Sequence, residues 1–411
     1  MSAPQGYFAF IRENAPFVGT GALLMLLSSF GQTFFISIFG GEIRDAFRLS
    51  NGDWGLIYMV ATMASAALVV WAGRLADLFR VRVLGAAVLC GLAVAVGALG
   101  LVGGWVGLLL VVFGLRFFGQ GMATHLSAVA MARWFVATRG RALALAGLGF
   151  LVGEATLPLA MVWLKAQVEW RSIWLGSAVL ILCTIPVLIH LLRLERTPQS
   201  VAAESHSTGM GNRHWTRGDV LRDPVFWMIV PTIMSFSAFG TAFWFHQVHF
   251  AEVKGWSHLA LVAVFPLGTV TLAISSIGFG WGIDRFGAIR LLPIYILPYV
   301  LAFVLHGYAP ALGWTALGVV LMGVSGGGHQ TLLNACWAEL YGTAHLGGIK
   351  SVATGLMVLG SALGPGLTGL LIDAGLPYET QLLGMAAVFA GCMTLMTVAS
   401  RRAEALSARA T

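Results

Sequence analysis

Two charged residues stand deep inside apolar stretches of this chain, and their types allow anion binding and proton transfer. Arg116 lies in the apolar run from Trp105 to Arg133, and Glu154 lies in the run from Arg141 to Leu164. A buried charge is costly unless it is paired or hydrated, so we expect both to face a polar path. An arginine can hold a carboxylate through two parallel hydrogen bonds, and a glutamate can take up a proton when its surroundings change.

Polar side chains that could orient a solute lie in two other apolar stretches. Gln32 falls in the first long run, and His329, Gln330 and Asn334 fall together in a run of the second half. Amides and imidazoles can hydrogen-bond a solute, but they also join membrane helices to one another. Both interpretations therefore stay open for these four residues.

The chain has none of the sequence patterns that would indicate an enzyme. No Gly-x4-Gly-Lys-Ser/Thr loop and no His-Glu-x-x-His pair occur. Cys90, Cys183, Cys336 and Cys392 all fall in apolar runs, without the spacing of a metal site or of a disulfide framework. We expect no catalytic residue, no metal ion and no cofactor.

The apolar stretches that carry these residues recur along the whole chain. Of its 411 residues, 58% are hydrophobic and 10% are charged, whereas ordinary soluble domains carry about 25% charged residues. A helix of about 20 residues crosses a bilayer. The pattern predicts an all-α membrane protein with twelve transmembrane helices, near Ala15 to Gly41, Trp54 to Asp77, Val81 to Val102, Trp105 to Arg133, Arg141 to Leu164, Arg171 to Arg193, Val225 to Phe250, His258 to Asp284, Ala288 to Tyr308, Gly313 to Tyr341, Leu346 to Asp373 and Thr380 to Ser400.

Basic residues are shared unevenly between the loops on the two sides of these spans. If both termini lie inside the cell, the outer loops hold only Arg44, Arg48, Lys165, Arg171 and Lys254. Because Lys and Arg gather on the cytoplasmic side, we expect a multi-pass protein with both termini cytoplasmic, in the inner membrane of a bacterial host. The pI of about 9.6 then reflects inner loops beside anionic membrane lipid, and no nucleic-acid partner is expected.

The two halves of the chain repeat one pattern. A shift of 207 positions superposes residues of the same type in separate spans: Gly73 and Gly280, Asp77 and Asp284, Gly153 and Gly360, and Pro158 and Pro365. Such a match indicates duplication of a six-span unit, as is common in transporters. We expect an N-terminal bundle over residues 1–193, a cytoplasmic linker over 194–223, a C-terminal bundle over 224–400 and a short cytoplasmic tail over 401–411.

Two loops at matching places resemble the loop signature of the major facilitator superfamily. The residues that carry the resemblance are Gly73, Arg74, Asp77 and Arg80 in the first loop, and Gly280, Asp284 and Arg285 in the second. The resemblance implies the fold of that superfamily, with two pseudo-symmetric six-helix bundles. It also implies that these are gating loops, in which Asp77 and Asp284 latch a neighbouring helix end in one access state. A plain topogenic role for the arginines is the alternative.

A narrower stretch is similar to the fourth and fifth spans of the monocarboxylate porter and oxalate:formate antiporter branch. The shared residues are Trp134, Phe135, Arg139, Gly140, Ala142, Ala146, Gly149 and Gly153. Members of that branch hold a carboxylate with an arginine in the eighth span and a lysine in the first or eleventh. Here the eighth expected span has no arginine before its inner loop, and Lys350 lies at the start of the eleventh.

These features together predict a secondary active transporter of a small solute. At about 1.5 Å per residue, Arg116 and Glu154 lie roughly 16 and 20 Å deep from the ends at which their spans enter the membrane, and could meet. Arg116 would bind an organic anion such as a carboxylate, Glu154 would couple a proton, and Gln32, His329, Gln330 and Asn334 would orient the solute. Transport would proceed by alternating access with proton symport or anion exchange, and a monomer is expected.

Three alternatives to this prediction stay open. Arg116 and Glu154 could form a permanent salt bridge that only joins their spans. The solute could be an exported apolar or amphipathic compound. The protein could also be a membrane sensor or scaffold that transports nothing.

Overall fold

Helices account for almost all of the structure, a computed structural model that describes residues 7–135, 138–193 and 208–408. Among these residues, eleven helices are long and apolar enough to cross a membrane, which confirms an all-helical membrane protein. The tenth expected span is also a helix, α18 (Leu312–Tyr341), but it is not one of the eleven. Its middle holds Ser325, His329, Gln330 and Asn334, which lower its hydropathy.

The helices group into two compact units. The first unit comprises Met1–Leu49 and Ile57–Ala203, and the second comprises Ser50–Leu56 and Glu204–Thr411. The boundary therefore runs through α4 (Asn51–Ala72), whose first residues pack with the second unit.

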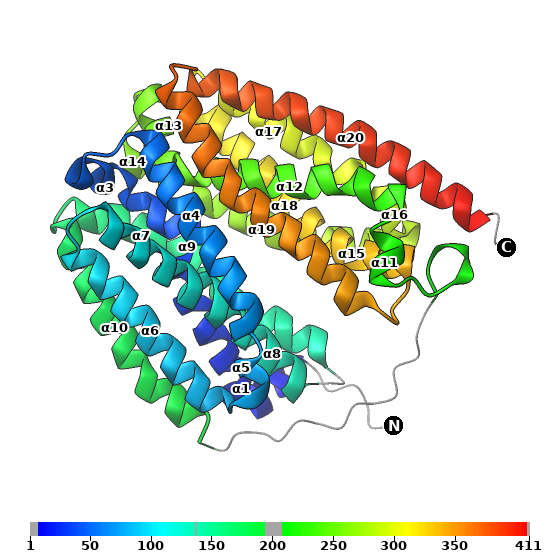
Figure 1. Cartoon of the computed structure of the whole chain (residues 1–411), viewed down its shortest axis with the longest axis horizontal. Coiled ribbons are helices and arrows are strands. Elements are labelled where there is room, and N and C mark those ends of the chain that lie inside the picture. Colours follow the sequence, from blue (N-terminus) through cyan, green and yellow to red (C-terminus); the bar gives the residue numbers. More distant parts are fainter. Residues whose placement is uncertain (1–6, 136–137, 194–207, 409–411) are drawn as a thin grey trace. The chain divides into compact units, whose positions relative to one another are not determined.

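The first unit is a bundle in which α1 packs against α8 and α9, while α6 packs against α10 (Figure 1). Its helices are α1 (Tyr7–Ser28), α2 (Thr33–Ile36), α3 (Gly40–Phe47), most of α4, α5 (Leu75–Leu78), α6 (Val81–Leu101), α7 (Trp105–Gly114), α8 (Thr124–Trp134), α9 (Arg139–Lys165) and α10 (Trp170–Leu191). Glycine makes the α1–α9 contact possible, because a Cβ atom on Gly149 would collide with the backbone of Ala22.

The second unit pairs α12 with α19, α15 with α18, and α17 with α20. Its helices are α11 (Arg217–Val220), α12 (Pro224–Phe245), α13 (Gln247–Lys254), α14 (His258–Val262), α15 (Phe265–Phe286), α16 (Ala288–Leu291), α17 (Leu297–Tyr308), α18, α19 (Leu346–Asp373) and α20 (Tyr378–Ala408). Here too glycine allows backbone contact, since a Cβ atom on Gly364 would collide with Ala238 of α12.

One glycine pair occupies equivalent places in the two units. A Cβ atom on Gly153 of α9 would collide with the hydroxyl oxygen of Ser29, and one on Gly360 of α19 would collide with the carbonyl oxygen of Met234. Gly153 and Gly360 are superposed by the shift of 207 positions. The duplicated pattern in the sequence thus places a glycine at matching positions of α9 and α19, each in close contact with another segment of its own unit.

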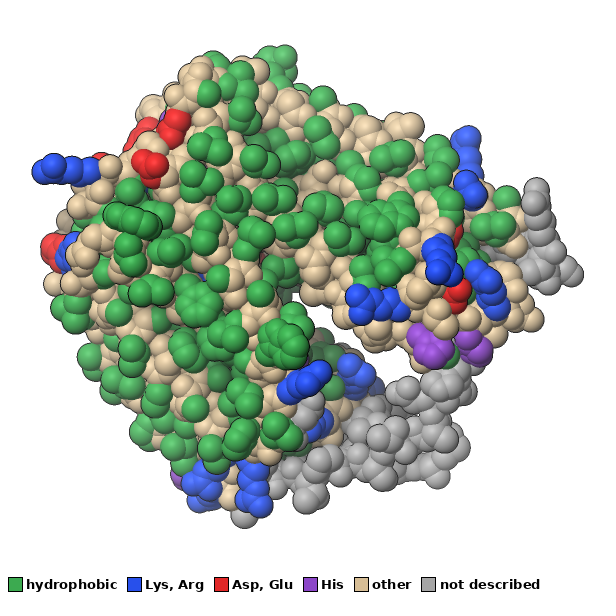
Figure 2. Space-filling model, viewed as in Figure 1, with side chains coloured by type: hydrophobic (Ala, Val, Ile, Leu, Met, Phe, Trp, Pro, Cys, Tyr) green, Lys and Arg blue, Asp and Glu red, His purple; other side chains and the backbone are tan. Residues whose placement is uncertain are grey.

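The surface of each unit suits a lipid environment. Large apolar side chains point outward, and Ile277 and Val70 are 77% and 73% exposed. In Figure 2 hydrophobic side chains cover much of the visible face, while most Lys and Arg side chains lie in its right and lower parts and a few at its left edge. This is the distribution expected of helices that face hydrocarbon along their length and water at their ends.

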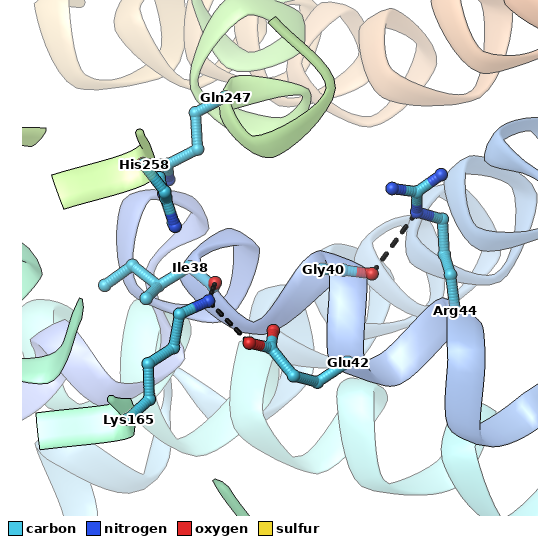
Figure 3. A network of polar contacts seen from close by, with 7 residues as sticks. All are labelled: Ile38, Gly40, Glu42, Arg44, Lys165, Gln247 and His258. Carbon is cyan, nitrogen blue, oxygen red and sulfur yellow. Dashed lines mark hydrogen bonds and ion pairs between the residues drawn. The ribbon is translucent and has the colours of Figure 1, made fainter. Parts of the chain in front are cut away.

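A lysine fastens the end of α9 in the first unit. Lys165 Nζ donates a hydrogen bond to the carbonyl oxygen of Ile38 at 2.9 Å and lies 2.7 Å from Glu42 Oε1 (Figure 3). Arg44 Nε donates to the Gly40 carbonyl oxygen at 3.3 Å in the same segment. The irregular chain between α2 and α3 is thereby tied to the end of a long helix.

The second unit has a similar fastening. Lys254 Nζ donates to the carbonyl oxygen of Gly307 at 3.1 Å and lies 3.6 Å from Glu379 Oε1, so it ties α13 to the ends of α17 and α20. His258 Nε2 lies 3.3 Å from Gln247 Oε1 and links α14 to α13.

Candidate functional site

The first expected span is a broken helix. α1 ends at Ser28, a short 3-10 turn covers Ser29–Gly31, and Gln32 has extended backbone angles (φ −85°, ψ 153°) before α2 begins at Thr33. Such a break frees backbone carbonyl and amide groups, which then need other partners. Discontinuous helices of this kind often form the solute site of a transporter.

The fourth span is irregular where it meets this break. A π-helical segment, Leu115–Ala123, separates α7 from α8, and short π-helices are frequent at functional sites. Gly31 and Gly119 touch closely, because a Cβ atom on Gly119 would lie 2.7 Å from the Gly31 Cα atom. Gly31 and Gly119, one from each segment, therefore let the backbones of the broken helix and the π-helical segment come into contact.

Arg116 connects these two irregular segments through one of its terminal nitrogens. Its side chain is fully buried, at 1% exposure. Nη1 donates to the carbonyl oxygen of Gly31 at 3.0 Å and lies 3.5 Å from Thr33 Oγ1, and the guanidinium carbon sits 5.0 Å from the centre of the Tyr58 ring. Within the part of the chain that the structure describes, Nε and Nη2 have no hydrogen-bond partner. Nη1 is held by the Gly31 carbonyl oxygen, whereas the buried Nε–Nη2 edge has no acceptor among the described residues.

Gln32 directly follows the residue whose carbonyl oxygen Arg116 binds, and Glu154 lies on α9. Gln32 is buried, at 8% exposure, and directly follows Gly31. Glu154 is half-buried on α9 and is not among the partners of Arg116 in the described residues. The structure therefore does not form the Arg116–Glu154 pair considered from the sequence.

The second unit contains a cavity of about 240 Å³ between α12, α18 and α19. All three polar residues singled out on α18 line it, together with an aromatic ring and two residues of α19: His329, Gln330, Asn334, Trp337, Lys350 and Met357. The rest of the lining is largely apolar. Such a mixture of apolar walls and few polar groups is typical of a small-molecule site.

Lys350 belongs to this cavity, although its position in the sequence places it only at the start of a span. Its Nζ donates to Asn334 Oδ1 at 3.1 Å, and Asn334 Nδ2 donates to the Gln330 carbonyl oxygen at 2.6 Å. A sequence signal was present, because Lys350 is the only basic residue of the helix Leu346–Asp373. A cation inside a span is a functional candidate for the same reason as Arg116.

His329 forms a rigid part of the cavity wall. Its ring stacks on Phe236 with centroids 3.9 Å apart and planes 5° from parallel, and Phe236 stacks in turn on Tyr299. His329 Nδ1 lies 3.4 Å from the Tyr295 hydroxyl oxygen, and the tautomer decides which of the two atoms donates. These contacts fix the orientation of the imidazole, which lines the cavity.

The first predicted gating loop is held by side chains of α8. His125 Nε2 lies 3.2 Å from the Gly73 carbonyl oxygen, and Arg133 Nη1 donates to the carbonyl oxygen of Ala76. The side chain of Asp77 lies outside the described residues, so its predicted latch is not assigned. The remaining two residues of this loop are exposed: Arg74 and Arg80.

The second predicted gating loop is held by a carboxylate that was not foreseen from the sequence. Glu339 Oε2 of α18 accepts a hydrogen bond at 2.8 Å from the backbone nitrogen of Ala288, at the start of α16. Asp284 is exposed and makes no hydrogen bond or ion pair with another described residue. Gly280 has open space around it, and Arg285 lies over aromatic rings of its own helix.

Comparison with known proteins gives a family and a fold. A sequence model of the Major Facilitator Superfamily matches residues 21–365 of this chain. The chain is also 34% identical over 125 residues to a protein of Cupriavidus pinatubonensis (strain JMP 134 / LMG 1197) described as a probable 4-methylmuconolactone transporter. That match spans 29% of this chain and 29% of the relative's length.

Solved structures share the fold at low sequence identity. A bacterial homolog of the human lysosomal transporter Spinster, in an inward-facing and unoccupied conformation, superposes with a TM-score of 0.70 at 15% identity, covering 99% of both chains. A mutant of the nucleoside transporter NupG gives a TM-score of 0.67 at 12% identity, covering 95% of this chain and 99% of its own. At such identities the likeness shows the architecture alone.

Proposed function

Because the chain belongs to the major facilitator superfamily, whose members are secondary transporters and not enzymes, we propose that its solute is a small organic anion such as a carboxylate. The observation that carries the proposal is the buried Nε–Nη2 edge of Arg116, which has no partner among the described residues. That edge has the spacing of the two oxygens of a carboxylate, which it can hold with two parallel hydrogen bonds.

The surroundings of Arg116 support this role. The bond from Nη1 to Gly31 fixes the plane of the guanidinium, and the Tyr58 ring stabilises its positive charge. Burial in a poorly polar environment strengthens the attraction to an anion, while the same burial makes an unpaired arginine costly. A bound carboxylate would offset that cost.

The cavity of the second unit supports a solute with both a charged and an apolar part. Lys350 and Asn334 supply polar contacts, and Trp337 and Met357 supply apolar ones. The match to a probable 4-methylmuconolactone transporter and the resemblance of residues 134–153 to the monocarboxylate porter branch favour the same class. The apolar part of the lining also favours a second candidate function, export of an apolar or amphipathic compound.

The remaining assignments complete the proposed mechanism. Glu154 couples a proton, Gln32, His329, Gln330 and Asn334 orient the solute, and the loops at Asp77 and Asp284 stabilise one access state. The bundles cover residues 1–193 and 224–400, joined by a cytoplasmic linker. The protein works as a monomer in the inner membrane with both termini in the cytoplasm, by proton symport or anion exchange.

Solute-driven proton movement tests the proposal. The purified protein is reconstituted in vesicles that contain a pH dye, and small mono- and dicarboxylates and 4-methylmuconolactone are added one at a time. Acidification by wild type that is lost in Arg116→Ala and Glu154→Gln supports anion–proton symport. Labelled-anion exchange without acidification, lost in Arg116→Ala alone, supports anion exchange. No flux of any anion in either assay would refute the proposal and favour export of an apolar compound.

The matched control is Arg401→Gln. Arg401 is an exposed arginine of α20, far along the chain from both candidate sites. This variant removes one positive charge without changing either site. If it lost transport as completely as Arg116→Ala, the effect of Arg116 could not be ascribed to anion binding.

A further inference from the structure

The chain just before α12 is folded onto the second unit. Residues 208–223, called the docked segment below, pass from Thr208 through α11 to Asp223, which caps the start of α12. Trp215 is buried, at 8% exposure. Its ring packs edge to face against the Tyr341 ring, with the ring centres 5.3 Å apart, and its backbone nitrogen donates to the Tyr341 carbonyl oxygen at 3.3 Å. One tryptophan therefore anchors the segment to the end of α18.

Both carboxylates of the docked segment are engaged within the protein. Asp223 is buried and accepts hydrogen bonds from the Tyr341 hydroxyl at 2.8 Å and from the backbone nitrogen of Val225 at 3.1 Å. Asp219 accepts from the hydroxyl and the backbone nitrogen of Thr216 in a capping box at the start of α11. Their charges are thus held by local donors.

The arginines of the docked segment lie at its surface, and the guanidinium carbon of Arg213 also lies over the Trp215 ring, 3.7 Å from its centre. Arg213, Arg217 and Arg222 are exposed, and none of them forms an ion pair with another described residue. Large apolar side chains lie next to them, because Leu221 is 37% exposed and Trp227, in the first turn of α12, is 48% exposed. Trp227 Nε1 donates to the Leu221 carbonyl oxygen at 2.8 Å, which fixes the indole at the helix start.

We propose that the docked segment binds the headgroups of anionic phospholipids through Arg213, Arg217 and Arg222. The segment lies where α12 begins and α18 ends, and the ends of spans lie at the level of lipid headgroups. Arginine holds phosphate with two hydrogen bonds, and a tryptophan at a helix end suits the boundary between headgroups and hydrocarbon. This inference is independent of the transported solute.

The expected strength of binding follows from the number of arginines. An arginine near an anionic membrane surface contributes about 1 kcal/mol, which corresponds to about a fivefold change in affinity per arginine. The interaction weakens with salt, because exposed charges are screened over about 10 Å at 0.1 M ionic strength. We therefore expect the affinity of the three arginines for anionic lipid to be high at low salt and low at high salt.

Hydrogen–deuterium exchange of the full-length protein in lipid nanodiscs tests the proposal. The nanodiscs contain phosphatidylcholine alone or phosphatidylcholine mixed with phosphatidylglycerol. We expect phosphatidylglycerol to slow exchange of the backbone amides of residues 208–223 severalfold at low salt. The triple variant R213Q/R217Q/R222Q should lose this protection, while exchange in α12 and α19 shows that it still folds.

The control variant R401Q/R402Q removes two exposed arginines of α20, outside the docked segment. It should keep the protection by phosphatidylglycerol. Equal exchange in the two lipids, or protection that persists in the triple variant, would overturn the proposal. Loss of protection in the control as well would also overturn it, because the response would then come from overall charge and not from these arginines.

Discussion

Arg116 Nη1 lies 3.0 Å from the carbonyl oxygen of Gly31, the last residue before the first span breaks at Gln32. The arginine thus supplies a hydrogen bond that the interrupted helix cannot make for itself. Its other edge, Nε and Nη2, takes no part in this contact. Structural support and anion binding can therefore be assigned to different atoms of one side chain, and a substitution can separate them.

Arg116→Lys should impair transport more than it impairs stability. A lysine ammonium can still donate to the Gly31 carbonyl oxygen, but it cannot form two parallel bonds with a carboxylate. Loss of one hydrogen bond to a charged group costs about 1.5–3 kcal/mol, so we expect the affinity for the anion to fall by about 10- to 150-fold. Uptake of labelled anion and thermal unfolding in detergent measure the two effects. Equal transport by the lysine variant would mean that the fork of Arg116 does not hold the solute.

Lys350→Met should weaken binding of a charged solute in the cavity of the second unit. The substitution keeps an apolar chain of similar length but removes the ammonium that donates to Asn334 at 3.1 Å. We expect affinity for a carboxylate to fall about tenfold, which is the effect of about 1.4 kcal/mol, and affinity for its uncharged amide to stay unchanged. Thr354→Val, in the same lining, is the control. A similar loss for acid and amide would instead indicate a damaged cavity.

Gly364→Ala should destabilise the second unit, whereas Gly355→Ala on the same helix should not. A Cβ atom at position 364 would collide with the backbone of Ala238, but one at position 355 would meet nothing within 4 Å. Overpacking of this kind costs about 1–3 kcal/mol, while alanine in open space favours the helix. Thermal unfolding of the two variants in one detergent gives the comparison. Equal melting temperatures would show that α12 and α19 can separate without cost.

Tyr341→Phe should loosen the docked segment. The phenol donates to Asp223, which is 6% exposed, and its loss leaves a largely buried carboxylate with one donor fewer. Such a loss costs about 1.5–3 kcal/mol. Faster amide exchange over residues 208–223 is the expected result. Tyr308→Phe, at a 71% exposed site, provides the control and should leave exchange there unchanged.

Acid should open α11 before the rest of the docked segment. Hydrogen bonds from the side chain and backbone of Thr216 hold the pKa of Asp219 below its ordinary value. Because this pKa is lowered on folding, the stabilisation is present above the ordinary aspartate pKa and is lost as pH falls through the lowered value. Asp219→Ala should show the same opening at neutral pH, by proteolysis near Arg217. A variant as resistant as wild type would mean that the capping box does not hold the helix.

The fold is largely predictable because hydrophobic runs and glycine spacings are visible in the sequence without knowledge of tertiary contacts. The apolar runs marked each span, and the 207-residue shift found the duplication that reappears as the Gly153 and Gly360 contacts. The break at Gln32 was not predictable. Residues 29–36 contain no proline and include four large apolar side chains, so the sequence does not mark Gln32 as the place where the helix stops.

The sequence does not show which residues that are far apart in the chain contact one another in the site. The apolar surroundings of Arg116 predict that it is buried, as it is in the structure, and depth alone suggests Glu154 as its partner, whereas the arginine bonds to Gly31. Glu339 was overlooked because it does not lie in the loop that it holds. Depth along a helix says how far a side chain lies from the membrane surface, but rotation about the helix axis decides which neighbour it meets.

The polar middle of α18 has a consequence for how the protein is made. α18 is less hydrophobic than the eleven candidate spans of the described residues, so it enters the bilayer less readily on its own. Its glycine, histidine and amide side chains reduce the free energy gained when the segment moves from the translocon into lipid. α15 precedes it in the chain and touches it closely, since Gly327 has the backbone of Leu272 against it. Insertion of α18 would therefore depend on α15 being already in place, so that a substitution in α15 could change how many spans the newly made chain acquires.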